Sequence, residues 1–202
     1  MFFCMPPGRY PILGSRKSTS ASRSNAVYHL RNSVNSSYVK DIYEEFTEYI
    51  RGLIAEALME NPSNIARIES GHPVEMRASK IVSHHVNNTL LEQIATEIFR
   101  SLEKEQSTIK LIDKTKSKLG LDVDQQIIDD AMPYLLMRHV LVHSNGRPDV
   151  EYLSKYPSIP IKDGKIDLKY TLANEAGKRI EALVLALDSD AISKHIIKDH
   201  QC

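Results

Sequence analysis

Apolar residues recur every three or four positions over several stretches of the chain, which is the spacing of helices that bury one face. The pattern predicts helices over about 38–59, 74–102, 124–143 and 172–197, with a shorter piece over about 108–119. Ser36 or Ser37 can cap the first helix, and Asn61-Pro62 ends it before a short turn over 63–69. The chain is therefore expected to be mainly helical.

Turn-forming residues separate these stretches. Gly120 ends the short piece, and Ser144-Asn145-Gly146 ends the helix predicted over 124–143, because these residue types tolerate a left-handed backbone. Pro133 either kinks that helix or marks a restart capped by Asp130. Asp163-Gly164 lies between two short apolar runs and predicts a two-residue β-hairpin. The expected fold is all-α: an up-and-down bundle of four to five helices with a small β-hairpin before the last helix.

The start of the chain differs in composition from the rest. Residues 1–34 contain no acid and five basic side chains, and Lys40 follows before the first acid, Asp41. A Ser- and Arg-rich stretch without hydrophobic periodicity predicts a disordered basic arm over 1–34, followed by one helical domain over 35–200. A transit peptide is the alternative interpretation of this arm.

Charge and cysteine usage limit the function classes. The chain has 26 basic and 26 acidic residues, and six of the basic ones lie in residues 1–40. The formal net charge of the remaining residues is therefore 20 minus 26, or −6. Such a body does not favour broad electrostatic binding of DNA. No apolar run approaches the roughly 18 residues of a membrane span, and Cys4 and Cys202 lie at opposite ends. We expect a soluble, cytoplasmic protein with no membrane contact.

The strongest candidate for chemistry is the end of the helix predicted over 124–143. Arg138 is followed by the polar His139, three apolar residues and His143, and the helix then stops at Ser144-Asn145-Gly146. Three other Arg and His pairs have comparable spacing: Arg23/His29, Arg67/His72 and Arg77/His84. None of them combines a polar residue after the Arg with a terminating turn after the His.

This segment resembles the signature of HEPN domains, in which an Arg, a polar residue, mostly apolar residues and a His close a helix. The likeness extends over about residues 36–200 and implies a HEPN-like bundle. It also implies a metal-independent endoribonuclease, a toxin or defence effector that acts as a homodimer without a cofactor. Arg138, His139 and His143 would be catalytic, and cleavage would leave a 2',3'-cyclic phosphate and a 5'-hydroxyl. An antitoxin or other neutralising protein is a candidate partner.

The residue types themselves suit this chemistry. At helical spacing Arg138 and His143 are about 500° apart around the axis, so they flank one side of the helix and leave room for a phosphate. The guanidinium offers a planar set of donors for phosphate oxygens, and an imidazole can donate or accept a proton near neutral pH. RNA carries its own nucleophile, the 2'-hydroxyl, so a base, an acid and a cation suffice.

Simpler interpretations remain open. A His at a helix end commonly caps carbonyl groups, and an Arg on a partly apolar helix often pairs with an acid. HEPN domains also include non-catalytic modules that dimerise or bind a partner, and this is the alternative function. A helical adaptor unrelated to the family is a third possibility.

A second polar group lies at Ser83-His84-His85. Because no third strong ligand has suitable spacing, we expect no metal site there, and a polar helix face is the default. The alternative is that His84 and His85, together with Asn145, line a dimer cleft and contact RNA.

Overall fold

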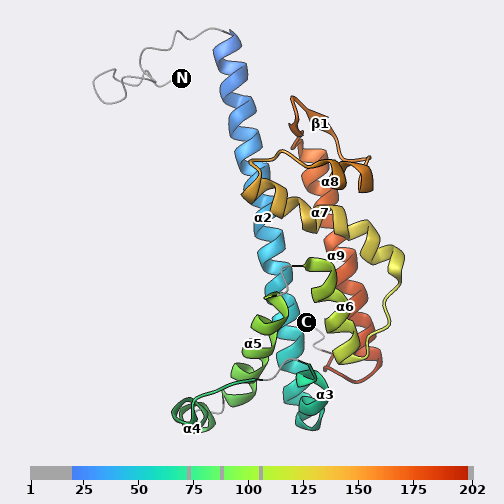
Figure 1. Ribbon diagram of the computed structural model, residues 1–202. Coiled ribbons are helices and arrows are strands. Elements are labelled where there is room, and N and C mark those ends of the chain that lie inside the picture. The colour runs from blue at the N-terminus through green and yellow to red at the C-terminus, as the bar shows by residue number, and fades with distance from the viewer. Residues whose placement is uncertain (1–19, 72–73, 87–88, 105–106, 200–202) are drawn as a thin grey trace, which may run out of the picture.

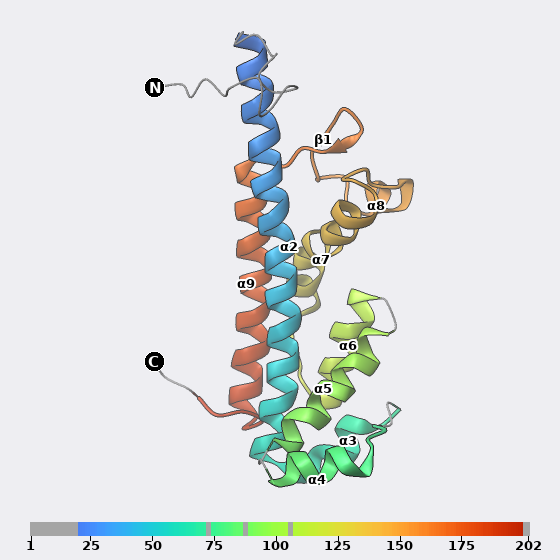
Figure 2. The same cartoon turned by 90° about the vertical axis from the view of Figure 1, so that its left-hand side faces the viewer.

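The longest helix, α2 (Ser20–Glu60), supplies the surface on which most of the others pack in the computed structural model (Figure 1). The structure describes residues 20–71, 74–86, 89–104 and 107–199. The helices that pack most extensively on α2 are α5 (Leu90–Glu103), α7 (Gln125–His143) and α9 (Tyr170–Ser193). α9 runs beside α2 over much of its length, and α7 crosses both (Figure 2).

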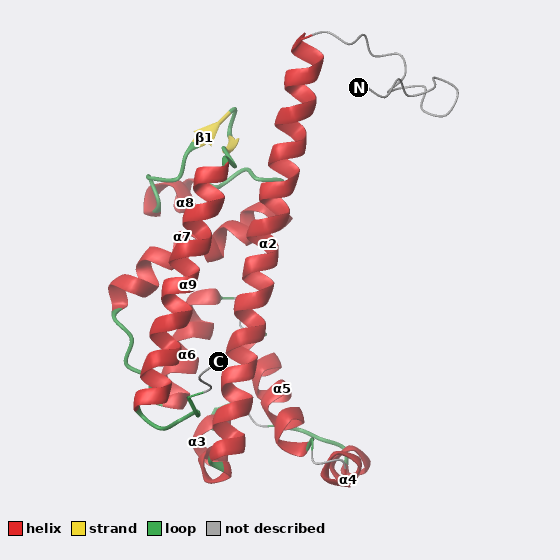
Figure 3. Ribbon diagram, turned by 180° about the vertical axis from the view of Figure 1, so that it is seen from behind, coloured by secondary structure: helices red, strands yellow, loops and turns green. Residues whose placement is uncertain are grey.

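The remaining elements flank these four helices. They are η1 (Pro62–Asn64), α3 (Ile65–Glu69), α4 (Ala78–Val86), α6 (Thr108–Leu119), α8 (Val150–Lys155), β1 (Ile161–Lys162) and β2 (Lys165–Ile166). α3 and α4 lie at one end, whereas α8 and the hairpin lie near the other (Figure 3). The end of α7 that carries the candidate chemistry is therefore on the hairpin side of the molecule.

A row of apolar side chains on α2 forms the centre of the core. Phe46, Ile50, Ile54 and Leu58 follow one another at four-residue spacing and are 0–1% exposed. At this spacing they share one face of the helix, and each contributes roughly 2 kcal/mol by leaving water. They belong to one cluster with buried residues of α5, α6, α7 and α9. Burial of this face explains why α2 forms despite its uneven sequence.

The start of α2 corrects the expectation from the sequence. The helix begins at Ser20, not near Tyr38, so residues 20–34 are helical and do not form a disordered arm. Residues 1–19 of the expected arm lie outside the described residues. Val27, Leu30 and Val34 recur at helical spacing in this part of the chain, but they are 59–67% exposed and pack on no described core. Once the buried part has formed, extending a helix costs little per residue.

The helix expected over about 74–102 is also corrected, because the structure has two helices there, α4 and α5. Thr89 precedes α5, and its backbone N–H donates to the carbonyl of His84 at 2.9 Å. The Thr89 hydroxyl lies 2.8 Å from Nδ1 of His84. This local pairing of Thr89 with the end of α4 competes with a continuous helix.

α7 continues through Pro133, so a restart capped by Asp130 is not found. The Asp130 carboxylate instead binds Arg179 of α9 at 2.7 Å. The Pro133 carbonyl accepts a buried hydrogen bond of 2.8 Å from the hydroxyl of Tyr152 on α8. α8 is thus attached to the middle of α7.

The end of α7 and the hairpin are one connected unit. As expected, α7 stops at Ser144-Asn145-Gly146, where Asn145 and Gly146 have φ values of 50° and 76°. The Gly146 carbonyl then accepts a hydrogen bond of 2.9 Å from the backbone N–H of Ile166 in β2. The predicted hairpin turn at Asp163-Gly164 is confirmed, with φ values of 52° and 72° and antiparallel strands.

The described residues contain eight α-helices, more than the four to five expected, because the segment expected as a turn over 63–69 forms η1 and α3, the helix over 74–102 is divided and α8 was not expected. The other helix ends agree with the structure to within a few residues. α2 ends at Glu60, before Asn61-Pro62, and α6 ends at the left-handed Gly120. α9 covers Tyr170–Ser193, a few residues short of the expected end. The all-α class with a hairpin before the last helix is confirmed. Among the described helices, none combines the length and the apolar character that crossing a bilayer requires.

Substitution of two glycines by alanine should change the free energy of unfolding in opposite directions, because their backbone conformations differ. Gly52 lies inside α2 with open space where a Cβ would lie, so Gly52→Ala should raise the free energy of unfolding by about 0.5–1 kcal/mol. Gly146→Ala should lower it by about 1–2 kcal/mol, because its φ of 76° disfavours any Cβ. Urea unfolding measures both, and equal effects of the two substitutions would contradict this assignment.

Candidate functional site

Arg138 projects from α7 onto α2. Its Nη2 lies 3.1 Å from Oε1 of Glu44, and its Cζ lies 5.2 Å from the centre of the Tyr43 ring. The Arg138 side chain is 31% exposed, and its Nε is buried without a hydrogen-bond partner among the described residues. The guanidinium is therefore held on one side by α2.

His139 and His143 lie one helical turn apart on α7 and are both exposed. Their ring centres are 4.6 Å apart and the rings are tilted by 41°. His143 is the last residue of α7. Two accessible imidazoles thus share one face at the end of this helix.

The two kinds of side chain do not converge within one chain. On an ideal helix His139 is about 100° and His143 about 140° around the axis from Arg138. Within the described part of the chain, no hydrogen bond or ring contact joins Arg138 to either imidazole. One α7 therefore presents the guanidinium and the imidazoles on adjacent faces, and a phosphate held by both would lie between them.

Carboxylates gather beside Arg138. Glu44 binds it directly, and the electrostatic influence of Glu44 and Glu48 reaches Glu103 at the end of α5. Burial, followed by repulsion from Glu44 and Glu48, raises the pKa of Glu103 above its ordinary value, and Arg138 acts in the opposite direction. Arg138 thus lies in an acidic part of the surface, which any anionic ligand must overcome.

Asn145 is exposed, immediately after the helix. Its φ of 50° places it in the left-handed region, which Asn adopts more readily than most residues. This requirement of the turn accounts for an Asn at this position, and a contact of Asn145 with RNA stays a prediction.

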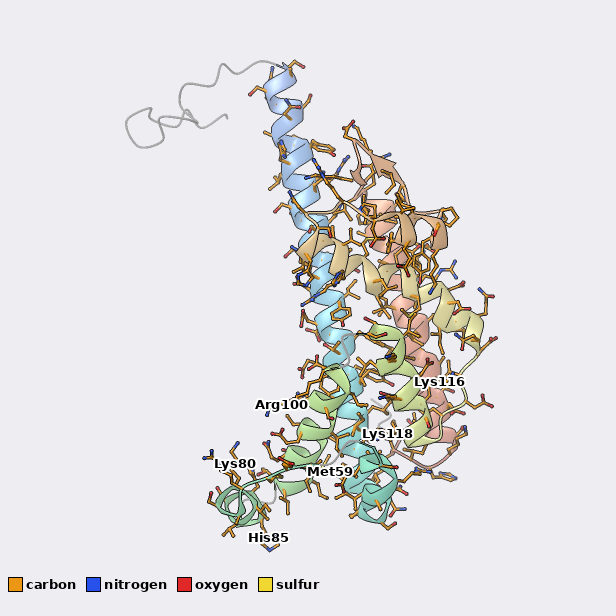
Figure 4. All side chains as sticks on the ribbon, in the orientation of Figure 1. Met59, Lys80, His85, Arg100, Lys116 and Lys118 are labelled. Carbon is orange, nitrogen blue, oxygen red and sulfur yellow. The ribbon has the colours of Figure 1, made fainter. Side chains whose placement is uncertain are left out.

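His84 and His85 are not brought near Arg138 within one chain. They lie in the last turn of α4, and Figure 4 shows His85 at the α4 end of the molecule, away from α7. His84 is half-buried with its Nδ1 at the Thr89 hydroxyl, and His85 is exposed. The described residues contain no group of three His, Cys, Asp or Glu side chains placed to hold a metal ion.

The residues around Arg138 had no signal in the sequence. Glu44 and Tyr43 are more than ninety positions away from Arg138, and Glu44-Glu45 resembles an ordinary solvated acidic pair. Glu44 is indeed 60% exposed, but it pairs with Arg138. Only the crossing of α2 and α7 reveals this contact.

Comparisons with known proteins give no match: no family model, no curated protein and no solved structure shows significant similarity to this chain.

Removal of the Glu103 charge should stabilise the protein in a pH-dependent way. A carboxyl group with a raised pKa binds its proton more tightly in the folded state, so its ionisation destabilises the fold above that pKa. Glu103→Gln should therefore raise the Tm near pH 7.5, and the gain should shrink as the pH falls toward 4. Glu103→Asp, which keeps a carboxylate, is the control. A gain independent of pH would show that the charge is not the cause.

Proposed function

We propose that the protein is a metal-independent endoribonuclease of the HEPN type that acts as a homodimer. Arg138 binds the scissile phosphate, His143 transfers protons, and His139 orients or shares either role. The observation that carries this proposal is the end of α7, where a half-exposed guanidinium and two exposed imidazoles 4.6 Å apart occur next to a terminating turn.

The chemistry needs no group beyond these side chains and the RNA. An imidazole removes the proton from a 2'-hydroxyl, whose oxygen attacks the adjacent phosphorus, and the bond to the 5'-oxygen breaks. A second imidazole, on the same α7 or on that of the partner, supplies the proton to the leaving 5'-oxygen. The guanidinium stabilises the negative charge that grows on the phosphate oxygens. The products are a 2',3'-cyclic phosphate and a 5'-hydroxyl.

The homodimer enters the proposal because Arg138 and the imidazoles occupy adjacent faces of one helix. Two α7 ends related by a two-fold axis would surround one phosphodiester from both sides. In this assembly Asn145 would lie close to the bound strand, and His84 and His85 would contact the RNA farther from the phosphodiester that is cleaved. A cytoplasmic toxin or defence role, with a neutralising protein as partner, is the biological setting that we propose.

A non-catalytic module is the second candidate, and one observation favours it. Arg138 is paired with Glu44 of its own chain at 3.1 Å, as expected for a guanidinium with a structural role. The pair is open to solvent, however, and exposed pairs contribute only about 0–1 kcal/mol. A phosphate can displace a carboxylate held so weakly.

Removal of the His143 imidazole tests the catalytic proposal. His143→Ala should reduce RNA cleavage by about 100-fold or more, the usual contribution of general acid–base catalysis. Cleavage by the wild type should persist in EDTA and leave cyclic phosphate termini, which mass spectrometry detects. His195→Asn is the control, because His195 is an exposed imidazole outside the site with a φ of 54° that Asn tolerates. A folded wild-type dimer that cleaves no RNA at micromolar concentration would leave the module as the function.

Arg138→Lys should also reduce cleavage strongly, because lysine keeps the charge and loses the planar set of donors. Activity near that of the wild type, measured in the same assay, would remove the phosphate-binding role of Arg138.

Neutralising Glu44 shows whether its carboxylate competes with the RNA phosphate for Arg138 or positions the Arg138 guanidinium. If Glu44 competes with phosphate for Arg138, Glu44→Gln should lower the KM for RNA by about fivefold, the equivalent of about 1 kcal/mol. Steady-state kinetics on a short fluorescent RNA gives KM and kcat separately. A higher KM or a lower kcat would mean that Glu44 positions the guanidinium and does not compete with the substrate.

A further inference from the structure

The first half of α2 carries an apolar stripe that the described part of the chain leaves largely exposed. Val27, Leu30, Val34 and Tyr38 recur at spacings of three and four and are 45–67% exposed. The first turns of α2 extend beyond the neighbouring α9 (Figure 2). An exposed row of this length on a helix is the usual mark of a docking surface.

The stripe continues into a groove between α2 and α9. Ile42 and Tyr49 of α2 line this groove together with Val184 of α9, and Glu45 and Glu181 add acidic groups to its lining. Gly177 of α9 leaves room for the Tyr38 side chain, because a Cβ there would lie 2.7 Å from the phenol oxygen. The surface is therefore apolar along its axis and acidic along the groove.

The charges of α2 indicate what fits there. Residues 20–40 hold Arg23, Arg31 and Lys40 and no acid, whereas residues 41–60 hold six acids and one Arg. A second α2 in the antiparallel direction would place a basic half on an acidic half at both ends of the contact. A parallel copy would place like charges together.

An antiparallel register also matches the apolar residues. With the two-fold axis at Tyr38, Val27 faces Tyr49 of the second copy and Val34 faces Ile42. The same register sets Arg31 opposite Glu45. The contact from Val27 to Tyr49 spans about 33 Å of helix at 1.5 Å per residue. We propose that two copies of this chain pair through the α2 stripe and groove in this antiparallel register.

This interface is separate from the α7 pairing of the proposed nuclease. On an ideal helix Tyr43 and Glu44, which hold Arg138, lie about 140° and 120° around α2 from Tyr38, in opposite directions. The stripe therefore lies on the far side of α2 from Arg138. Neither the proposal nor its test depends on RNA cleavage.

Sedimentation equilibrium of the full chain gives the first test. The wild type should associate, to dimers through α2 alone or to larger assemblies where the α7 pairing also forms, and Val34→Glu should raise the dissociation constant of the α2 step about tenfold or more, because each interface would bury two unpaired carboxylates. Val34 is exposed, so the variant should keep its helical content by circular dichroism. A monomeric wild type, or a dimer unaffected by Val34→Glu, would overturn the proposal.

A charge exchange tests the register. Arg31→Glu and Glu45→Arg should each weaken the dimer, and the double variant should restore it. The two residues are about 21 Å apart along one helix, so rescue requires pairing between chains. Arg31 also lies 3.8 Å from Asp167, a contact that Glu45→Arg cannot repair. Absence of rescue would reject this register.

Cross-linking identifies the face. In a background with Cys4→Ser and Cys202→Ser, Asp41→Cys should give dimers with a short bismaleimide, because the two positions would lie about 9 Å apart along the axis. Ser144→Cys, at the end of α7, is the matched comparison. Cross-linking through Ser144→Cys alone would show that the copies meet at α7, and would overturn the α2 interface while leaving the proposed function in place.

Discussion

Burial of a single face of α2 is the constraint on which the arrangement of the other helices depends. Phe46, Ile50, Ile54 and Leu58 are all but completely removed from water, and α5, α7 and α9 pack around the helix that carries them. The position of Arg138 follows from the same packing, because Tyr43 and Glu44 lie on α2 just before the first of these buried residues. The core and the surroundings of the candidate site are thus set by one crossing of helices.

The parts of the fold that the sequence predicted are those governed by local chemistry. Gly120, Ser144-Asn145-Gly146 and Asp163-Gly164 stop helices or form a turn because of their own backbone preferences, and each does so in the structure. The start of α2 and the break before Thr89 could not be predicted in this way. The early start results from the extension of α2 beyond its buried part. The break is accompanied by a contact between the side chains of Thr89 and His84.

The candidate site likewise has a part that the sequence predicts and a part that it does not. The placement of Arg138, His139 and His143 at the end of one helix follows from their spacing and from the turn after them. The acidic surroundings of Arg138 do not, because Glu44 and Glu103 belong to distant segments. A pattern along the chain can name the groups that would perform a reaction, whereas their electrostatic environment is a property of tertiary packing.

The hydrogen bond between Gly146 and Ile166 links the turn after His143 to the hairpin through the backbone alone. The hairpin is itself tied to α2, where the side-chain amide of Asn35 donates to the Leu168 carbonyl at 2.7 Å. A path of two hydrogen bonds therefore runs from α2 to the imidazole end of α7. The turn after His143 is therefore anchored to β2 by main-chain groups, with no side chain as intermediary.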